Sequence, residues 1–373
     1  MKGKLLRKIR HIGRYALHAA AITVLAAVLS CTLIYSFTSM LALKSSIEVK
    51  DHQFSDLYSV VAYKSTTPRL NDSIVLVATD GLTRDEIARV LNTVQHSNPK
   101  VIGIDIIFEH PYIGDSLLIA ATSSPNIVMA QMFDDGEDFA IHGSYFCNSS
   151  HLSQSGVTNI EYGVVRHYRH NFNLGGIQYP SFAAAVAIAG GHDLSQQSLD
   201  DSYICFLPHE FQCITPDIIR SYPEECDAIL KDKIVLLGDI HDSHDMHQTP
   251  IGRLSGLKIQ AATIETIIGN HGILQVSSAT GWAIAIISCF LIVLFNIILT
   301  ENRVFSGKLI FRLAQLLLLY LFFWIGCYLF AHLNLYVDFA PVLTLIAIAL
   351  LVSDLYWGAL ALVNHVKHKY TRK

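Results

Sequence analysis

The sequence predicts an α/β fold class: a doubly wound, mainly parallel sheet domain, with one transmembrane helix before it and three after it. One observation is a strand–helix–strand pattern between Ser73 and Phe108. Another is the set of four apolar segments, each long enough to cross a bilayer. The third is composition: 51% of residues are hydrophobic and the mean hydropathy is +0.38, which is high for a soluble protein.

The strand–helix–strand pattern is the central element of the predicted domain. Continuous apolar segments at Ile74–Ala78 and Val101–Phe108 predict two strands of a sheet that is covered on both faces. Between them, Thr83 and Glu86 form a capping box at the start of a helix. Its apolar residues recur at helical spacing: Ile87, Val90, Leu91 and Val94. Such a unit is almost always a right-handed βαβ crossover with parallel strands.

Further elements follow along the chain. We expect helices at Ser116–Ala121 (capped by Asp115), Ser181–Ala189, Pro223–Leu230 and Lys258–Ile268. We expect strands at Asn126–Gln131, Tyr203–Leu207 and Lys233–Leu237. The segment Phe133–Tyr162 reads as loops or an antiparallel excursion, and a long loop is expected to run from Gly238 to Leu257.

The distribution of basic residues predicts the membrane topology. Tyr15–Leu43 is uncharged apart from His18, follows a basic segment and lacks a convincing cleavage site, so we expect an uncleaved signal anchor. The connector 300–312 contains Arg303, Lys308 and Arg312, the connector 332–338 contains no Lys or Arg, and the tail is basic. By the positive-inside rule both termini are cytoplasmic and the sheet domain is exported to the periplasm or the cell exterior.

The expected organisation is as follows: a basic N-terminus (1–14), a first transmembrane helix (15–43), the extracytoplasmic domain (44–278), transmembrane helices at 279–300, 309–332 and 336–363, and a basic tail (364–373). Ten polar tail residues are too few to form an output domain.

The charge balance excludes one function class. Between Lys44 and Ser278 there are 28 Asp and Glu residues against 14 Lys and Arg, so the predicted domain carries a net charge of −14. An acidic domain does not bind nucleic acid by the usual electrostatic route. We therefore expect no nucleic-acid partner.

Four cysteines lie in the predicted domain: Cys147, Cys205, Cys213 and Cys226. An exported domain permits disulfides. Cys205 and Cys213 are close in sequence and are the favoured pair, with free buried thiols as the alternative.

Acidic residues lie at the ends of three predicted strands. Asp80 and Asp239 follow their strands and Asp105 lies within its own. Ligands of open parallel sheets bind beyond the carboxyl ends of the strands, where these acids could bind a cation, a cationic ligand or sugar hydroxyls. The alternative is that Asp80 and Asp239 cap turns or helices and that Asp105 bonds to a loop.

A second cluster lies in the segment HDSHDMH. His241, His244 and His247, with nearby carboxylates, are weak candidates for a transition-metal site, because their spacing matches no standard ligand motif. The alternative is a polar loop over the crevice, and no cofactor is predicted. We find no nucleophile elbow, H-E-x-x-H motif, Walker A loop or dinucleotide fingerprint, and expect no enzymatic activity.

The order of motifs from Phe54 to Ile268 resembles the CHASE type-two domain, an extracytoplasmic sensory domain associated with cyclases and histidine kinases. The matching segments are FSDLY, IVLVATDG, VIGIDIIFE, DSLLIAA, GVVRH, YPSF, KIVLLGD, a D-x-x-x-T-P sequence and LSGLKIQAATIETII. The three following apolar segments also fit the family. The resemblance implies a bacterial protein of the inner (cytoplasmic) membrane, here in a stand-alone form without an output domain.

The resemblance also suggests which residues bind a ligand. The candidates are Asp80, Asp105, Arg166, Asp239, Asp245 and Thr249. The family's Trp/Pro-rich stretch is missing, with Arg84 standing for its arginine, Tyr162 replaces an acid, and Gln260 replaces a common His.

The leading hypothesis is a membrane-anchored sensor that binds a small molecule and signals to a separate membrane or cytoplasmic partner. Formation of a homo-oligomer is a further open alternative. One alternative is a structural subunit of a cell-envelope complex. Another is a periplasmic metal-assisted hydrolase that uses the strand-end acids and the His-rich loop. Four spans without paired interrupted helices do not suggest a transporter.

Overall fold

The chain forms two compact units, residues 51–274 and residues 1–50 with 275–373. We call them the sheet domain and the helical unit, and describe each by itself. The computed structural model describes residues 2–43, 53–133, 141–146, 155–158, 160, 163–195, 202–301 and 307–371.

The sheet domain is built on a mainly parallel sheet. Within the described residues the sheet has seven strands in the order β10-β1-β11-β2-β3-β4, with β5 also paired to β3. All neighbouring pairs are parallel except β3 and β4. The strands are β1 (Arg69–Ala78), β2 (Val101–Ile104), β3 (Ile127–Phe133), β4 (Ile141–Gly143), β5 (Ser155–Val157), β10 (His209–Ile214) and β11 (Ile234–Gly238).

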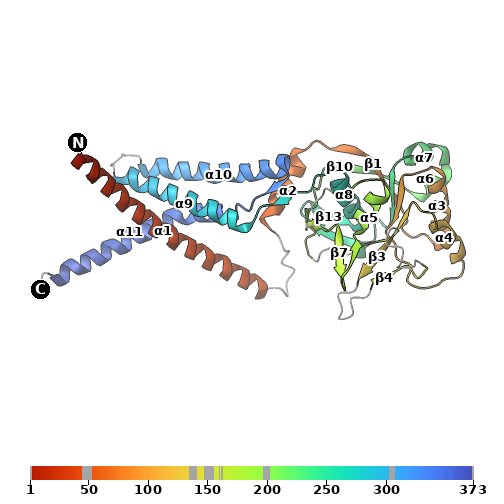
Figure 1. The fold of residues 1–373 in the computed structure, drawn as a ribbon, viewed down its shortest axis with the longest axis horizontal. Helices are drawn as coiled ribbons and strands as arrows, with labels where there is room; N and C mark the ends of the chain where they lie inside the picture. Colours follow the sequence, from red (N-terminus) through yellow and green to blue (C-terminus); the bar gives the residue numbers. More distant parts are fainter. Residues whose placement is uncertain are drawn as a thin grey trace. The chain divides into compact units, whose positions relative to one another are not determined.

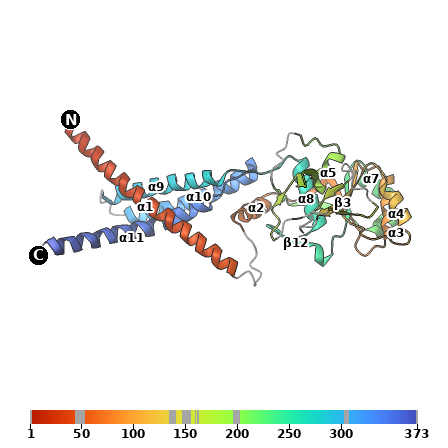
Figure 2. The same cartoon turned by 60° about the horizontal axis from the view of Figure 1, so that its bottom comes forward.

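Helices cover both faces of this sheet, which explains the continuous apolar strands (Figures 1 and 2). In β1, Ile74 and Leu76 face one core, whereas Val75 and Val77 face the other. The second core contains side chains of α3 (Arg84–His96), α4 (Asp115–Thr122), α6 (Pro216–Ser221) and α7 (Pro223–Leu230). The first core contains α5 (Phe182–Ala189) and α8 (Gly256–Ile268). The predicted α/β class is therefore confirmed.

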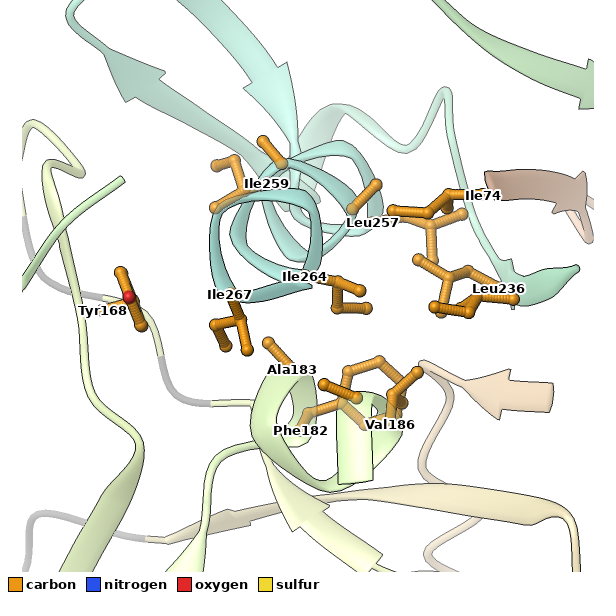
Figure 3. Close-up of a cluster of buried hydrophobic side chains, with 14 of the residues drawn as sticks. Ile74, Tyr168, Phe182, Ala183, Val186, Leu236, Leu257, Ile259, Ile264 and Ile267 are labelled. Atoms are coloured by element: carbon orange, nitrogen blue, oxygen red, sulfur yellow. The ribbon is translucent and has the colours of Figure 1, made fainter. Parts of the chain in front are cut away.

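The core around α5 and α8 covers one face of the sheet. Figure 3 shows Ile264 and Ile267 of α8 facing Ala183 of α5, with Leu257 beside Ile74. Most of α8 is buried, so it is an internal helix rather than the amphipathic one expected. Tyr168 lies on a separate segment opposite these helices.

The segment expected to be a long loop before Leu257 is ordered, and this expectation was wrong. It contains the 3-10 turn η2 (Ser243–Asp245) and the antiparallel hairpin of β12 (Met246–Thr249) and β13 (Gly252–Ser255). The remaining short elements are α2 (Phe54–Ser65), β6 (His167–Tyr168), β7 (Asn171–Leu174), β8 (Ile177–Pro180), β9 (Ser202–Tyr203) and β14 (Leu274–Gln275). The strand expected at Tyr203–Leu207 is limited to β9, which pairs with β6.

Two local assignments also change. β2 ends at Ile104, so Asp105 follows the strand instead of lying within it, although its N–H still donates to Leu237 O at 2.8 Å. Asp115 is the first residue of α4 and not its cap, because Gly114 occupies the cap position. The Asp115 carboxylate instead accepts bonds from Arg84, Tyr145 and the Tyr112 N–H.

The favoured disulfide is absent: Cys205 and Cys213 are free thiols, as is Cys226. Cys205 lies beside Glu265, and Cys213 lies near Lys258. Glu265 and Lys258 are both residues of α8 and are seven positions apart. Seven residues of α-helix span roughly 10 Å, which is too far for a disulfide. Cys147 lies outside the described residues.

In the helical unit, four helices of the described residues are long and apolar enough to cross a membrane, as predicted. They are α1 (Lys2–Leu43), α9 (Ser278–Glu301), α10 (Gly307–Leu333) and α11 (Ala340–Thr371), with β15 (Leu335–Tyr336) between the last two. α1 crosses α9 and α11 (Figures 1 and 2). Small residues such as Ala19, Ala285 and Ala349 are buried where these helices pack.

Candidate functional site

The three strand-end acids lie at the carboxyl ends of adjacent strands. Asp80 follows β1, Asp239 follows β11 and Asp105 follows β2, and these strands are neighbours in the order β1-β11-β2. A parallel sheet places such residues at one edge. The sheet order therefore brings together residues that are far apart in sequence.

Asp80 organises the turn after β11. Its carboxylate accepts the backbone N–H groups of Ile240 (3.1 Å) and His241 (2.7 Å). Burial raises the pKa of Asp80, but these backbone bonds and the nearby His241 outweigh it, so the pKa is lowered overall. Asp80 thus acts as the cap considered in the alternative interpretation, although it caps a turn distant in sequence.

Asp239 is connected to the end of β1. Its Oδ1 accepts the hydroxyl of Thr79 at 2.8 Å, and the Thr79 N–H donates to Gly238 O at 3.1 Å. These two bonds join the ends of the two central strands.

Asp105 is the acid whose titration the fold changes most. Burial and the nearby Asp245 raise the pKa of Asp105 to about 7, against a lowering effect of His247, with Asp239 adding a smaller increase. Three carboxylates thus act on one another at this edge of the sheet. Like charges that share a site favour protonation of one member, and here that member is Asp105.

Asp245 connects this acidic cluster to α8. Its Oδ2 accepts the N–H of Gly256, the first residue of α8, at 2.9 Å, and its Oδ1 lies 3.2 Å from His247 Nε2. A Cβ atom on residue 256 would lie 2.6 Å from both carboxylate oxygens, so this contact requires glycine. The charge state of the cluster therefore acts directly at the start of α8.

The other two predicted ligand residues make internal contacts. The guanidinium of Arg166 is 1% exposed and donates to both oxygens of Asp56, at 2.7 and 2.9 Å. The Thr249 hydroxyl donates to Gly252 O at 2.6 Å within the hairpin. In the structure Arg166 holds α2 against the domain, and Thr249 closes the β12–β13 turn.

The histidines of the candidate metal loop diverge. His241 lies 3.6 Å from Asp80, His247 pairs with Asp245, and the His244 N–H donates to Asp242. Among the residues that the structure describes, no group of three or more His, Cys, Asp or Glu side chains is arranged to hold a metal ion.

A polar network at the other end of α8 was not predicted. Glu265 accepts Asn71 Nδ2 at 2.6 Å and lies 2.5 Å from His209 Nδ1. It connects α8 to β1 and β10. The sequence feature that indicates this network is a single acid within the largely apolar segment IQAATIETII. A buried charge requires partners, so such an acid predicts polar contacts.

The fold, the buried helix that precedes a membrane span and the four apolar helices together define a membrane-anchored α/β domain. The model of the CHASE2 domain family matches residues 27–295, most of the chain. The chain therefore belongs to the CHASE2 family, whose domain is an extracytoplasmic sensory module rather than a catalytic one. The searches of curated proteins and of solved structures gave no match.

Proposed function

We propose that the sheet domain senses a condition outside the cytoplasm and transmits the change through α8 to the membrane helices and then to a separate signalling partner. The observation that carries this proposal is the position of α8. It is buried in one of the two cores of the sheet domain, and residues 269–277 alone separate it in sequence from α9.

Contacts at both ends of α8 support this role. Asp245 binds the first N–H of the helix, and Glu265 binds Asn71 and His209 near its last turn. A change at the acidic cluster, or in the core between these contacts, would thus alter the position of α8. Closely packed elements shift between discrete arrangements rather than deform continuously.

The packing of the membrane helices would respond to such a shift. In the helical unit α9 packs against α1, α10 and α11. Movement of α9 would therefore change its packing against all three helices. The basic segments at both ends of the chain favour cytoplasmic termini in an inner membrane, where a kinase-like or cyclase-like partner would act.

The test begins with purification of the whole protein from its native membrane in mild detergent. We expect mass spectrometry to identify a stoichiometric partner with a cytoplasmic signalling domain. In the reconstituted complex, Glu265→Gln weakens the contact of α8 with His209 and should change the activity of the partner. Recovery of the protein without a partner would contradict the proposal.

A flexible insertion separates transmission from binding. Gly-Ser-Gly inserted after Asn270 should leave the partner bound but make its activity insensitive to Glu265→Gln. The matched control is the same insertion after Gly175, at the β7–β8 turn of the same domain, which should preserve the response. A response that survives the insertion after Asn270 would show that α8 does not transmit the signal.

A further inference from the structure

A carboxyl group lies in the middle of the last membrane helix. The apolar span of α11 covers Ala340–Lys367, 28 residues, and Asp354 is the fifteenth of them. At about 1.5 Å per residue this span is about 42 Å long, against about 30 Å for the hydrocarbon core of a bilayer. Wherever that core lies along the span, Asp354 is therefore at least about 9 Å inside both of its boundaries.

The residues that follow Asp354 support this depth. Leu355, Leu362 and Val363 are 61%, 68% and 49% exposed. If the membrane ended near Asp354, these apolar side chains would lie in water, whereas lipid would cover them if the span continues to Lys367. The short side chain of Asp354 cannot reach the headgroups as the long side chains of Lys and Arg do. A carboxyl group at this depth is costly unless a polar group pairs with it.

The described part of the helical unit offers Asp354 no such group. Its side chain is exposed, and among the described residues it makes no hydrogen bond or ion pair. His18 of α1 lies at a similar level, but its Nδ1 is already 2.8 Å from the hydroxyl of Tyr356. The Lys and Arg residues of the four candidate spans all lie within two residues of a span end: Arg14, Arg312 and Lys367. A second copy of this chain therefore cannot place a Lys or Arg at the depth of Asp354.

Asp354 lies on an exposed stripe of α11 that another helix can contact. Leu351, Asp354, Gly358 and Leu362 recur at helical spacing and are all exposed, whereas Val352 is buried in the core of the helical unit. A Cβ atom at Gly358, one turn beyond Asp354, would meet nothing within 4 Å. A small residue with open space around it lets the backbone of a second helix approach closely.

We propose that Asp354 binds a lysine or arginine near the middle of a transmembrane helix of a separate protein, and that the exposed stripe around Asp354 packs against that helix. A basic side chain supplies both the opposite charge and the hydrogen-bond donors that a carboxylate lacks. Because α11 packs against α1 and α9, a shift of α9 would reach the bound helix through α11. This inference rests on the proposed function and states the chemistry by which its partner binds.

The first experiment uses the full chain in lipid nanodiscs, with a synthetic transmembrane helix of leucine and alanine that carries one central lysine as the probe. Energy transfer between the labelled chain and the labelled peptide measures their association. We expect binding at least about tenfold tighter than that of the same peptide with a central leucine, because the lysine and Asp354 neutralise each other in lipid. The peptide with its lysine moved to one end should bind as weakly as the leucine peptide.

Asp354→Asn should remove most of this preference, since it keeps the shape of the side chain but not its charge. The matched control is Asp338→Asn, which removes an acid just before the same helix and should leave the preference unchanged. The Asp338 carboxylate accepts the Ala340 N–H at 3.0 Å, a bond that Asn retains. Equal binding of the lysine and leucine peptides, or equal effects of the two variants, would overturn the assignment. Energy transfer between two labelled chains that Asp354→Asn abolishes would also overturn it, because the occupant would then be a second copy.

The second experiment concerns the partner that is recovered with the whole protein from its native membrane. This partner should have a Lys or Arg in the middle of a span. Asp354→Lys should abolish its recovery, and replacement of the partner's basic residue by Asp should restore it. A partner that the Asp354→Lys variant still binds would overturn this inference but leave the proposed function intact. Recovery of no partner would instead contradict the proposed function, and the peptide experiment alone would then decide the role of Asp354.

Discussion

Asp105 shows how one residue can make the sheet domain sensitive to pH. Its pKa is raised to about 7 from an ordinary value of 3.8, chiefly by burial and by Asp245. The folded state therefore binds this proton more tightly than the unfolded chain. The resulting stability is fully present below about pH 4 and is lost as the pH rises through about 7.

Replacement of Asp105 by Asn should remove this dependence. A shift of one pKa unit corresponds to about 1.4 kcal/mol, so the cost of ionising Asp105 is at most about 4 kcal/mol. Asp105→Asn should therefore have a higher thermal midpoint than the unaltered protein at about pH 8, and the difference should be clearly smaller at about pH 5, where only the first part of this stability has been lost. Thermal unfolding of the full chain in detergent at both pH values measures this difference.

The control is Asp217→Asn, because the Asp217 side chain is 92% exposed. This variant should follow the unaltered protein at both pH values. If Asp105→Asn gives the same change in midpoint at about pH 5 and about pH 8, then Asp105 does not titrate in this window.

At the scale of elements, the attachment of α2 to the sheet domain depends on a buried ion pair. The Arg166 and Asp56 side chains are 1% and 8% exposed, and Asp56 also accepts the N–H of Gln53 at 2.8 Å. Loss of one partner from a buried pair leaves an uncompensated charge, which costs about 3–5 kcal/mol. Replacement of both by apolar residues of similar size costs much less.

We therefore expect Asp56→Leu and Arg166→Met each to lower the thermal midpoint more than the double variant does. A double-mutant cycle of thermal unfolding on the full chain measures this coupling. The matched control is the exposed pair Arg220–Glu86, at 3.2 Å, where the cycle should give less than about 1 kcal/mol. If the effects of the Asp56 and Arg166 substitutions on the free energy of unfolding simply add, the pairing does not stabilise the domain and Arg166 has a different role.

Elements with strong apolar periodicity were predictable, and those without it were not. The capping box at Thr83 and the spacing that follows it correctly predicted α3. By contrast, β10 has the mixed sequence HEFQCI and partial burial, because it lies at the edge of the sheet and pairs only with β1 among the described strands. The β12–β13 hairpin likewise lacks apolar periodicity, because most of its residues are only partly buried and the two buried ones, Thr249 and Ser255, are polar.

At the scale of the whole molecule, the sequence predicted the gathering of the strand-end acids and, as one alternative, the capping role of Asp80, but not the contacts of Asp239 and Asp105. The parallel-sheet rule places the carboxyl ends of these strands at one edge, whereas the order β1-β11-β2 came from the structure. The pairing of Arg166 with Asp56, and that of Glu265 with His209, joins residues far apart in the chain. No local spacing encodes such contacts, so they required the three-dimensional arrangement.

Membrane topology determines which side of the membrane the acidic cluster faces, and labelling of the exposed thiol of Cys213 can report that topology. If the sheet domain is exported, a charged maleimide that does not cross membranes should label the unaltered protein in spheroplasts, and Cys213→Ser should lose most of that label. His365→Cys, at an exposed position of α11, should be labelled in the Cys213→Ser background only after the membrane is permeabilised. The reverse pattern would place the sheet domain in the cytoplasm. Asp105 would then respond to cytoplasmic pH, and the direction of signalling proposed above would be wrong.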